Sequence, residues 1–229
     1  MKALVLSSGG LDSTTCLAMA VKKLGAENVS ALSIFYGQRH ERELQSAQAV
    51  AKFYNVAHYE LDAAEIFKQS HSALLNTSTE SIEKSSYAAQ KKKNNSKKIA
   101  TYVPFRNGLM ISIAASFADS IYENDSVELY IGVHSDDAND AAYADCRADF
   151  IASMSAAIRI GTYEKIKLVA PFLCQRKADV VKVGLELKVP YHLTWSCYER
   201  GDTPCGKCAT CLDRAKAFEL NGVKDPALQ

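Results

Sequence analysis

Two consecutive glycines directly after a short apolar run restrict the fold more than any other feature of this sequence. Residues 2–7 (Lys-Ala-Leu-Val-Leu-Ser) have the length and apolar character of a strand buried on both faces of a parallel sheet. After Gly9 and Gly10, apolar residues recur at helical spacing over residues 11–24. The sequence therefore predicts a strand, a tight loop and a helix, which together form the first unit of an α/β fold.

The same alternation continues along most of the chain. We predict further strands over 29–36, 56–61, 127–133 and 166–169, and helices over 41–54, 107–122, 145–160 and 177–188. This alternation indicates a Rossmann-like, doubly wound parallel sheet. Because 229 residues suit a single α/β core, we assign residues 1–190 to that domain and 191–229 to a C-terminal module packed on it.

Residues 70–100 interrupt the pattern, because they contain few apolar residues and many serines, threonines and asparagines. A lysine-rich stretch lies within them, with Lys91, Lys92, Lys93, Lys97 and Lys98. Such a composition predicts a mobile insertion.

The glycine loop has the chemistry of a phosphate site. It comprises Ser7, Ser8, Gly9, Gly10, Leu11, Asp12, Ser13, Thr14 and Thr15, and it lies at the carboxyl edge of the predicted sheet, where such folds bind ligands. The first amides of the following helix have no partner within the helix and can bind phosphate. The hydroxyl groups can add donors, and the carboxylate can orient the loop or hold magnesium between phosphates.

The order of residues in this loop separates it from the better-known nucleotide motifs. No lysine follows the glycines, and the spacing is not Gly-x-Gly-x-x-Gly. Ser-Gly-Gly-x-Asp-Ser instead resembles the PP-loop of the ATP pyrophosphatases, which implies ATP as the nucleotide. The residues alone also permit an Asp-capped helix after a glycine turn.

Four cysteines near the C-terminus have the spacing of a metal site. Cys197, Cys205, Cys208 and Cys211 can close a tetrahedral shell around zinc with no open position, which describes a structural site. An iron-sulfur cluster uses the same ligands and remains an alternative. Lys207, Arg200 and Arg214 can offset part of the thiolate charge.

Composition limits the class of partner. With 27 Lys and Arg against 26 Asp and Glu, the chain has no basic excess that favours nucleic acid, so a small-molecule substrate is expected. No run approaches the roughly 20 apolar residues that span a bilayer, and no signal peptide is visible. We therefore expect no membrane association and a cytoplasmic location, in which cysteines stay reduced.

Three further segments narrow the resemblance from the ATP pyrophosphatases as a whole to one family. They are Tyr36-Gly37-Gln38-Arg39-His40, Val103-Pro104-Phe105-Arg106-Asn107 and Tyr143-Ala144-Asp145-Cys146-Arg147. Together with the PP-loop and the cysteines, in this order, they resemble the 7-cyano-7-deazaguanine synthase family of queuosine and archaeosine biosynthesis. The resemblance implies conversion of 7-carboxy-7-deazaguanine and ammonia to the nitrile through an acyl adenylate and an amide. It also implies two ATP molecules consumed, zinc on the four cysteines and a homodimer.

Roles follow for individual residues. Asp12, Arg39, Arg106 and Lys177 are candidate catalytic residues. The three cations can stabilise the charge that develops as pyrophosphate leaves, and Asp12 can orient the loop or hold magnesium. Arg39 and Lys177 can also be solvated surface cations. The candidate substrate residues are Tyr36, Tyr143, Asp145 and Arg147, with a carboxylate facing the guanidine-like edge of the base and tyrosines stacking on it.

His40 and His134 can carry protons near neutral pH, although structural histidines are commoner. The chain also departs from the pattern of the family it resembles. Phe105 stands where members generally carry Gly, and Ala144 where they carry Pro. The loop over residues 134–142 differs from the common version. The loop favours one alternative, a relative that makes an amide or a protein conjugate. Two others stay open: another PP-loop enzyme, such as one acting on tRNA or an NAD synthetase, and a zinc-ribbon interaction module without catalysis.

Overall fold

Five parallel strands form the sheet that the alternation of elements predicts, in the order β3-β2-β1-β4-β5. The computed structural model describes residues 1–39, 41–94, 99–138, 143–199 and 201–228. The strands are β1 (Lys2–Leu6), β2 (Val29–Phe35), β3 (Ala57–Asp62), β4 (Val127–Tyr130) and β5 (Ile166–Val169). Strand β1 therefore lies at the centre, between β2 and β4, where the strand order reverses.

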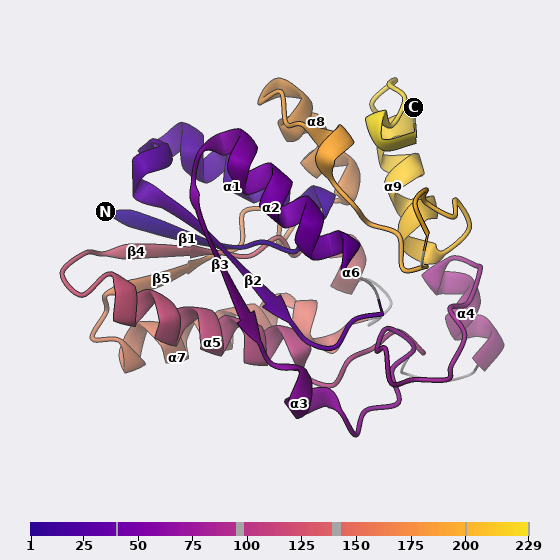
Figure 1. The fold of residues 1–229 in the computed structure, drawn as a ribbon, viewed down its shortest axis with the longest axis horizontal. Coiled ribbons are helices and arrows are strands. Elements are labelled where there is room, and N and C mark those ends of the chain that lie inside the picture. The colour runs from indigo at the N-terminus through magenta and orange to yellow at the C-terminus, as the bar shows by residue number, and fades with distance from the viewer. Residues whose placement is uncertain (40, 95–98, 139–142, 200, 229) are drawn as a thin grey trace.

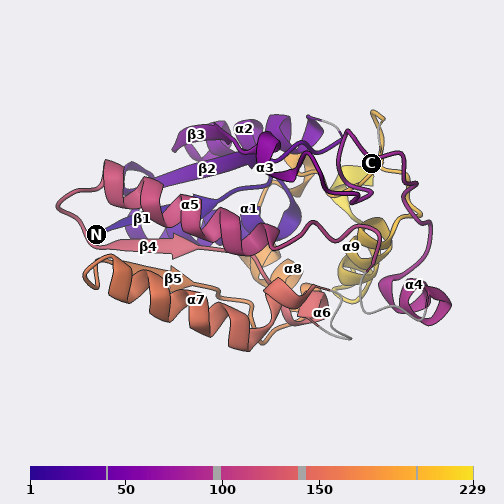
Figure 2. The same cartoon turned by 90° about the horizontal axis from the view of Figure 1, so that it is seen from below.

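Helices cover both faces of this sheet, as Figures 1 and 2 show. Helices α1 (Leu11–Leu24), α2 (Arg42–Tyr54) and α8 (Lys177–Glu186) lie on one face, and α5 (Arg106–Ile121) and α7 (Ala148–Gly161) lie on the other. The remaining α-helices are α3 (Ala64–Phe67), α4 (Tyr87–Asn94), α6 (Ser135–Ala138) and α9 (Ala209–Glu219). Short 3-10 helices are η1 (Ala26–Asn28), η3 (Ala144–Cys146), η4 (Tyr191–Leu193) and η5 (Pro226–Leu228).

The central strand is apolar on both sides, which explains its uninterrupted run of small and branched side chains. Ala3 and Val5 pack into the cluster beneath α1 and α8, whereas Leu4 packs into the cluster beneath α5 and α7. All three side chains are fully buried. Burial of a leucine or valine contributes about 1.5–3 kcal/mol, so the alternation fixes the strand firmly between the two helical layers.

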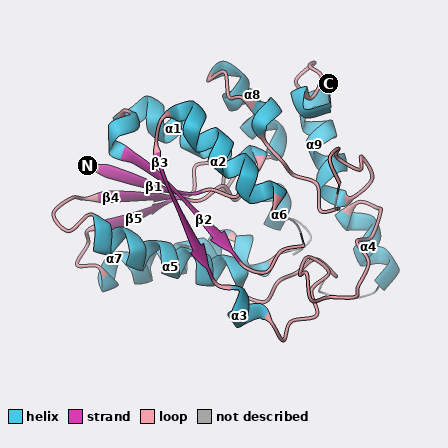
Figure 3. Ribbon diagram, viewed as in Figure 1, coloured by secondary structure: helices cyan, strands magenta, loops and turns pink. Residues whose placement is uncertain are grey.

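Most predicted elements agree with the structure to within two residues, but two boundaries differ by three residues. Figure 3 distinguishes the helices from the strands. Strand β4 ends at Tyr130 rather than continuing to residue 133. The backbone at Gly132 leaves the strand and passes the loop after β1, so closely that a methyl group on Gly132 would lie 2.9 Å from the backbone nitrogen of Ser13. The helix predicted over 145–160 begins only at Ala148, after the separate turn η3.

The segment predicted as a mobile insertion, residues 70–100, contains helix α4 and several buried side chains in its described part. Ala73, Leu74 and Leu75 pack with Trp195 and Cys208 in a third apolar cluster. This part of the insertion therefore packs with the C-terminal module. Mobility over 70–100 stays a prediction, and Lys97 and Lys98 lie outside the described residues.

The C-terminal module shares its core with the α/β domain. Tyr191 and Phe218 belong to the cluster beneath α1 and α8. Arg214 is buried, and its guanidinium donates to both carboxylate oxygens of Asp225 at 2.6 and 2.9 Å and to the hydroxyl of Thr194 at 2.8 Å. The boundary predicted between residues 190 and 191 stays a prediction.

Among the described residues, no helix combines the length and apolar character that crossing a membrane requires.

Gly9 lies where the first turn of α2 crosses the loop after β1. Its φ of +73° is in the left-handed region, which favours glycine. A methyl group there would overlap the backbone oxygen of Glu43 and would lie 2.6 Å from the backbone nitrogen of Ala47. The close approach of two backbones therefore requires glycine at this position.

We expect Gly9→Ala to destabilise the protein more than Gly222→Ala, which serves as its control. Gly222 has a similar φ of +69°, but a methyl group there would have no atom within 4 Å. Both variants carry the left-handed penalty of about 1–2 kcal/mol. Gly9→Ala adds overpacking of about 1–3 kcal/mol, which urea unfolding of the two variants measures as a difference. Equal losses in the two variants would contradict the proposed backbone contact.

Candidate active site

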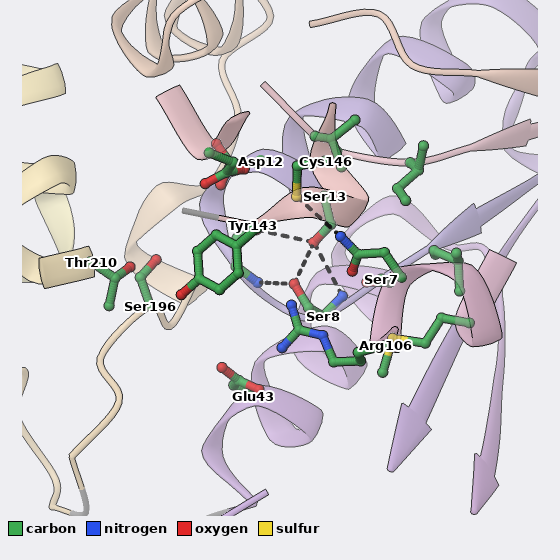
Figure 4. A pocket seen from close by; sticks show the side chains of 18 of the residues that line it. Ser7, Ser8, Asp12, Ser13, Glu43, Arg106, Tyr143, Cys146, Ser196 and Thr210 are labelled. Carbon is green, nitrogen blue, oxygen red and sulfur yellow. Dashed lines mark hydrogen bonds between the residues drawn. The ribbon is translucent and has the colours of Figure 1, made fainter. Parts of the chain in front are cut away.

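A cavity of about 230 Å³ opens at the carboxyl ends of β1, β2 and β4. The predicted residues Ser7, Ser8, Gly10, Asp12, Ser13, Tyr36, Arg106, Tyr143 and Lys177 line it, together with Glu43, Asn107, Asp137, Trp195, Tyr198 and Asp213. Figure 4 shows side chains of the loop after β1, of Arg106 and of Glu43 around the same space. The fold thus brings together nine residues that sequence patterns singled out from five separate segments.

The loop after β1 presents the start of α1 to this cavity. Gly10 is the N-cap residue, and in the part of the chain that the structure describes no side-chain hydrogen bond caps the helix. The hydroxyl of Ser13 accepts from the amide of Ser8 at 3.2 Å and donates to the carbonyl of Gly10 at 3.3 Å, which fixes the turn. The uncapped first turn carries partial positive charge, so this end of the cavity suits an anion.

The other predicted loop residues lie behind the cavity wall. Leu11 is fully buried in the core, and the carbonyl of Gly9 accepts from the amide of Trp195 at 2.9 Å. Thr14 is fully buried. The hydroxyl of Thr15 donates to the carbonyl of Leu11 at 2.9 Å and bonds the Tyr191 hydroxyl at 2.8 Å. These residues hold the loop in place rather than face the cavity.

Lys177 and Asp12 form a buried ion pair beside the loop. The Nζ of Lys177 donates to Oδ2 of Asp12 at 2.9 Å and lies 3.2 Å from Nε2 of His134. Burial tends to raise the pKa of Asp12, but Lys177 and His134 outweigh it and hold that pKa below its ordinary value. Burial likewise tends to lower the pKa of Lys177, and Asp12 outweighs it, so the lysine keeps its charge.

Two further carboxylates flank this pair. Asp137 Oδ2 lies 3.4 Å from His134 Nε2, and Asp213 lines the cavity from α9. Burial raises the pKa of Asp213, which Lys177 partly offsets. This side of the cavity therefore combines one fixed cation with several carboxylates, an arrangement that suits a divalent cation held beside phosphate oxygens.

Arg106 forms the opposite wall with two partners. Its Nη1 donates to the Tyr36 hydroxyl at 3.3 Å, and its guanidinium carbon lies 5.2 Å from the centroid of the Tyr36 ring. Glu43 lies in the first turn of α2, and burial raises its pKa to about 7 although Arg106 lowers it. Sequence reasoning missed Glu43. The feature that could have identified it is its place in the first turn of a predicted helix that directly follows the Tyr36–Arg39 segment.

Three tyrosines from distant segments meet at one end of the cavity. The hydroxyls of Tyr87 and Tyr198 are 2.8 Å apart, and that of Tyr143 lies 3.3 and 3.4 Å from them. Thr101 bonds the Tyr143 hydroxyl at 3.0 Å. Tyr143 was predicted to contact the substrate, whereas Tyr87 and Tyr198 were not recognised. No local signal identifies these two, because their meeting depends on how the insertion packs on the C-terminal module.

Outside the glycine loop, the predicted site residues Arg39, Arg147 and Asp145 do not line the cavity. Arg39 donates to the backbone carbonyls of Ser78 and Glu80 and so ties the insertion to the end of β2. Arg147 pairs with Asp149 at 2.7 Å, and both side chains are largely exposed. His40 lies outside the described residues.

Asp145, the third of these, is buried and caps the start of α5. Its Oδ2 accepts from the amide of Asn107 at 2.9 Å. A carboxylate at a helix N-terminus is stabilising, and here it fixes the turn that carries Arg106. The residue before Arg106, Phe105, has a φ of +52°, which explains why glycine suits this position better than a bulky side chain.

The four cysteines predicted to bind metal lie together. Their sulfur atoms are all within 4.8 Å of one another. The amide of Cys205 donates to Sγ of Cys197 at 3.3 Å, and the amide of Cys208 donates to Sγ of Cys205 at 3.3 Å. Backbone amides directed at sulfur stabilise thiolates, so the cluster fits a metal ion. Arg214 contacts Asp225 rather than the sulfur atoms, and Arg200 lies outside the described residues.

Comparisons with known proteins agree with the resemblance. A match to the family described as queuosine biosynthesis protein QueC extends over residues 2–222. The 7-cyano-7-deazaguanine synthase of Archaeoglobus fulgidus is 41% identical over 230 residues, which cover 100% of this chain and 90% of that protein. The enzyme of the same name from Pseudoalteromonas atlantica is 40% identical, over 98% of this chain and 97% of that protein.

Among solved structures, NMN synthetase from Francisella tularensis matches with a TM-score of 0.47 and 13% identity, over 97% of this chain and 78% of that chain. The family match and the two curated relatives each extend over nearly the whole chain and agree with one another. The chain therefore belongs to the family of queuosine biosynthesis protein QueC, the family that its motifs indicate.

Proposed function

We propose that this chain is an ATP-dependent carbon-nitrogen ligase that converts 7-carboxy-7-deazaguanine and ammonia into 7-cyano-7-deazaguanine, releasing AMP and pyrophosphate. The observation that carries the proposal is the uncapped start of α1, which shares one cavity with Lys177 and Arg106. Membership of the family, and relatives named 7-cyano-7-deazaguanine synthase, support the choice of substrate and product.

The phosphates of ATP would bind at the start of α1. The hydroxyls of Ser8 and Ser13 and the backbone of Gly10 line the cavity at this point. Lys177 and Arg106 supply positive charge from two sides of the cavity. Lys177 is held in place by Asp12, and Arg106 is held by Tyr36. Cations held in place stabilise the charge on departing pyrophosphate without reorganising during the reaction.

Magnesium fits the carboxylate side of the cavity. Asp12 uses Oδ2 for Lys177, and its Oδ1 has no hydrogen-bond partner among the described residues. Asp137 and Asp213 line the same side. Magnesium takes one or two carboxylates together with phosphate oxygens and water, so this set would hold the ion that accompanies ATP.

The reaction needs the same phosphate site twice. The substrate carboxylate attacks the α-phosphorus, pyrophosphate leaves, and an acyl adenylate forms. Ammonia then displaces AMP to give the amide. In a second adenylation, the amide oxygen attacks the α-phosphorus of another ATP, and loss of AMP with two N–H protons yields the nitrile.

The deazaguanine ring would lie against the aromatic end of the cavity. Tyr36 and Tyr143 face this space, and Tyr87 and Tyr198 extend the same wall. Tyrosine rings stack on planar bases and keep a polar hydroxyl for hydrogen bonding. We assign supporting roles to Arg39, Asp145 and Arg147, because each side chain already contacts other parts of the protein.

The cysteine cluster would hold zinc as a structural ion. Four thiolates complete a tetrahedral shell and leave no position for substrate. The cluster lies next to Trp195 and Tyr198, which line the cavity, so the metal would support the cavity wall from behind. A homodimeric state and a cytoplasmic location remain predictions.

Mass spectrometry of the products tests the proposed reaction. Purified protein incubated with 7-carboxy-7-deazaguanine, ATP, magnesium and ammonium should yield the nitrile, with two AMP formed per nitrile. Accumulation of the amide as the final product, or formation of a protein conjugate, would contradict the assignment.

Asp12→Ala should lower pyrophosphate exchange into ATP, measured with the carboxylate substrate and without ammonium, by at least about 100-fold. The reason is loss of the partner that holds Lys177 and of a magnesium ligand. Zinc content should stay unchanged. Asp62→Ala, which alters an exposed carboxylate at the end of β3 away from the cavity, is the matched control and should keep full exchange. Full exchange in Asp12→Ala would refute the role of the loop.

Cys208→Ser should lower the zinc content measured by elemental analysis and reduce the melting temperature, because the cluster loses a fully buried ligand. Cys174→Ser alters an exposed cysteine outside the cluster and should change neither value. A stable, metal-free and active Cys208→Ser protein would show that no structural metal is needed.

A further inference from the structure

Glu43 lies beside the phosphate loop without a role in the reaction described above. Its backbone oxygen packs against Gly9, so the first turn of α2 is in direct contact with the loop. Its side chain lines the cavity on the side of Arg106, as Figure 4 shows. A carboxylate at this position is close to the site where an acyl adenylate would form.

The surroundings of Glu43 leave its carboxylate available to a ligand. No hydrogen bond to the carboxylate is formed within the described ranges, and Arg106, its charged neighbour, donates to the Tyr36 hydroxyl. The other carboxylates of the wall, Asp12, Asp137 and Asp213, are gathered around Lys177 and His134. Glu43 thus faces the cavity from the side away from the carboxylates that suit magnesium.

We propose that Glu43 binds the ammonium ion and accepts one of its protons, which generates the ammonia that attacks the acyl adenylate. This inference rests on the proposed function and assigns a further catalytic residue to it. Ammonium is a small cation that a half-buried carboxylate attracts, and it has no lone pair until it loses a proton. A carboxylate base at the site of attack can therefore both bind ammonium and convert it to ammonia, the nucleophile.

The step balances as follows. One N–H bond of ammonium breaks, and its proton moves to a carboxylate oxygen of Glu43. The freed lone pair forms a C–N bond at the acyl carbon. The bond from that carbon to the phosphate oxygen then breaks, AMP leaves with the electron pair, and the nitrogen gives a second proton to solvent. Glu43 returns its proton to solvent before the next turnover.

The ionisation of Glu43 suits this task. Burial raises its pKa to about 7, and Arg106 partly opposes the rise. The groups that face it are Arg106 from α5 and Tyr36 from the end of β2. A base with a pKa near the working pH is ionised often enough to accept a proton and basic enough to hold it. Amide formation should therefore rise with pH through about 7, as the carboxylate form becomes dominant.

The test compares Glu43→Gln with Glu41→Gln, which makes the same chemical change at an exposed position two residues away. Pyrophosphate exchange without ammonium reports adenylation, and amide formation reports the step with ammonium. We expect Glu43→Gln to lower amide formation by about 100-fold or more, to raise the KM for ammonium and to remove the pH limb near 7. Exchange should fall by only a few-fold, and Glu41→Gln should behave as wild type.

Hydroxylamine provides a second readout, because it is largely unprotonated at neutral pH and needs no base to expose its lone pair. Glu43→Gln should form the hydroxamate at close to the wild-type rate. Parallel losses with ammonium and hydroxylamine, or an unchanged response to ammonium and pH, would overturn the role of Glu43 alone. Absence of exchange and of product in the wild-type protein would overturn the proposed function as well.

Discussion

The loop after β1 keeps its shape because two other backbones press against it with no side chain between. Gly9 meets the first turn of α2, and Gly132 passes the start of α1 after leaving β4. A third contact comes from the C-terminal module, whose Trp195 amide donates to the carbonyl of Gly9 at 2.9 Å. Three segments that are far apart in sequence therefore set the position of the phosphate site relative to Arg106, Lys177 and Glu43.

Much of the fold could be predicted because the sheet is buried on both faces. A strand such as β1, with Ala3, Leu4 and Val5 fully buried, must be apolar throughout, and its helices must be amphipathic. The glycine loop and the cysteine spacing are equally local signals, since their chemistry depends on near neighbours. Both are found at the expected places, at the end of β1 and around the start of α9.

The rest of the site depends on packing that no local pattern encodes. Tyr87 and Tyr198 meet only because the insertion folds against the cysteine cluster. Asp145 has the chemistry of a substrate ligand, yet the amide of Asn107 occupies one of its oxygens. Glu43 looks like an ordinary helix residue until the contact with Gly9 places it in the cavity wall. The sequence thus identified most of the segments that contribute to the cavity. The tertiary contacts decide which side chains of those segments face it.

The buried pair between Arg214 and Asp225 connects the cavity to the segment that follows α9. Arg214 follows directly after Asp213, which lines the cavity, and its guanidinium is satisfied chiefly by a residue close to the C-terminus. A buried cation without its partner is costly, so Asp225 stabilises the position of α9 against Thr194. A change at Asp225, although far from the cavity in sequence, would therefore be felt at the phosphate site through α9 and Asp213.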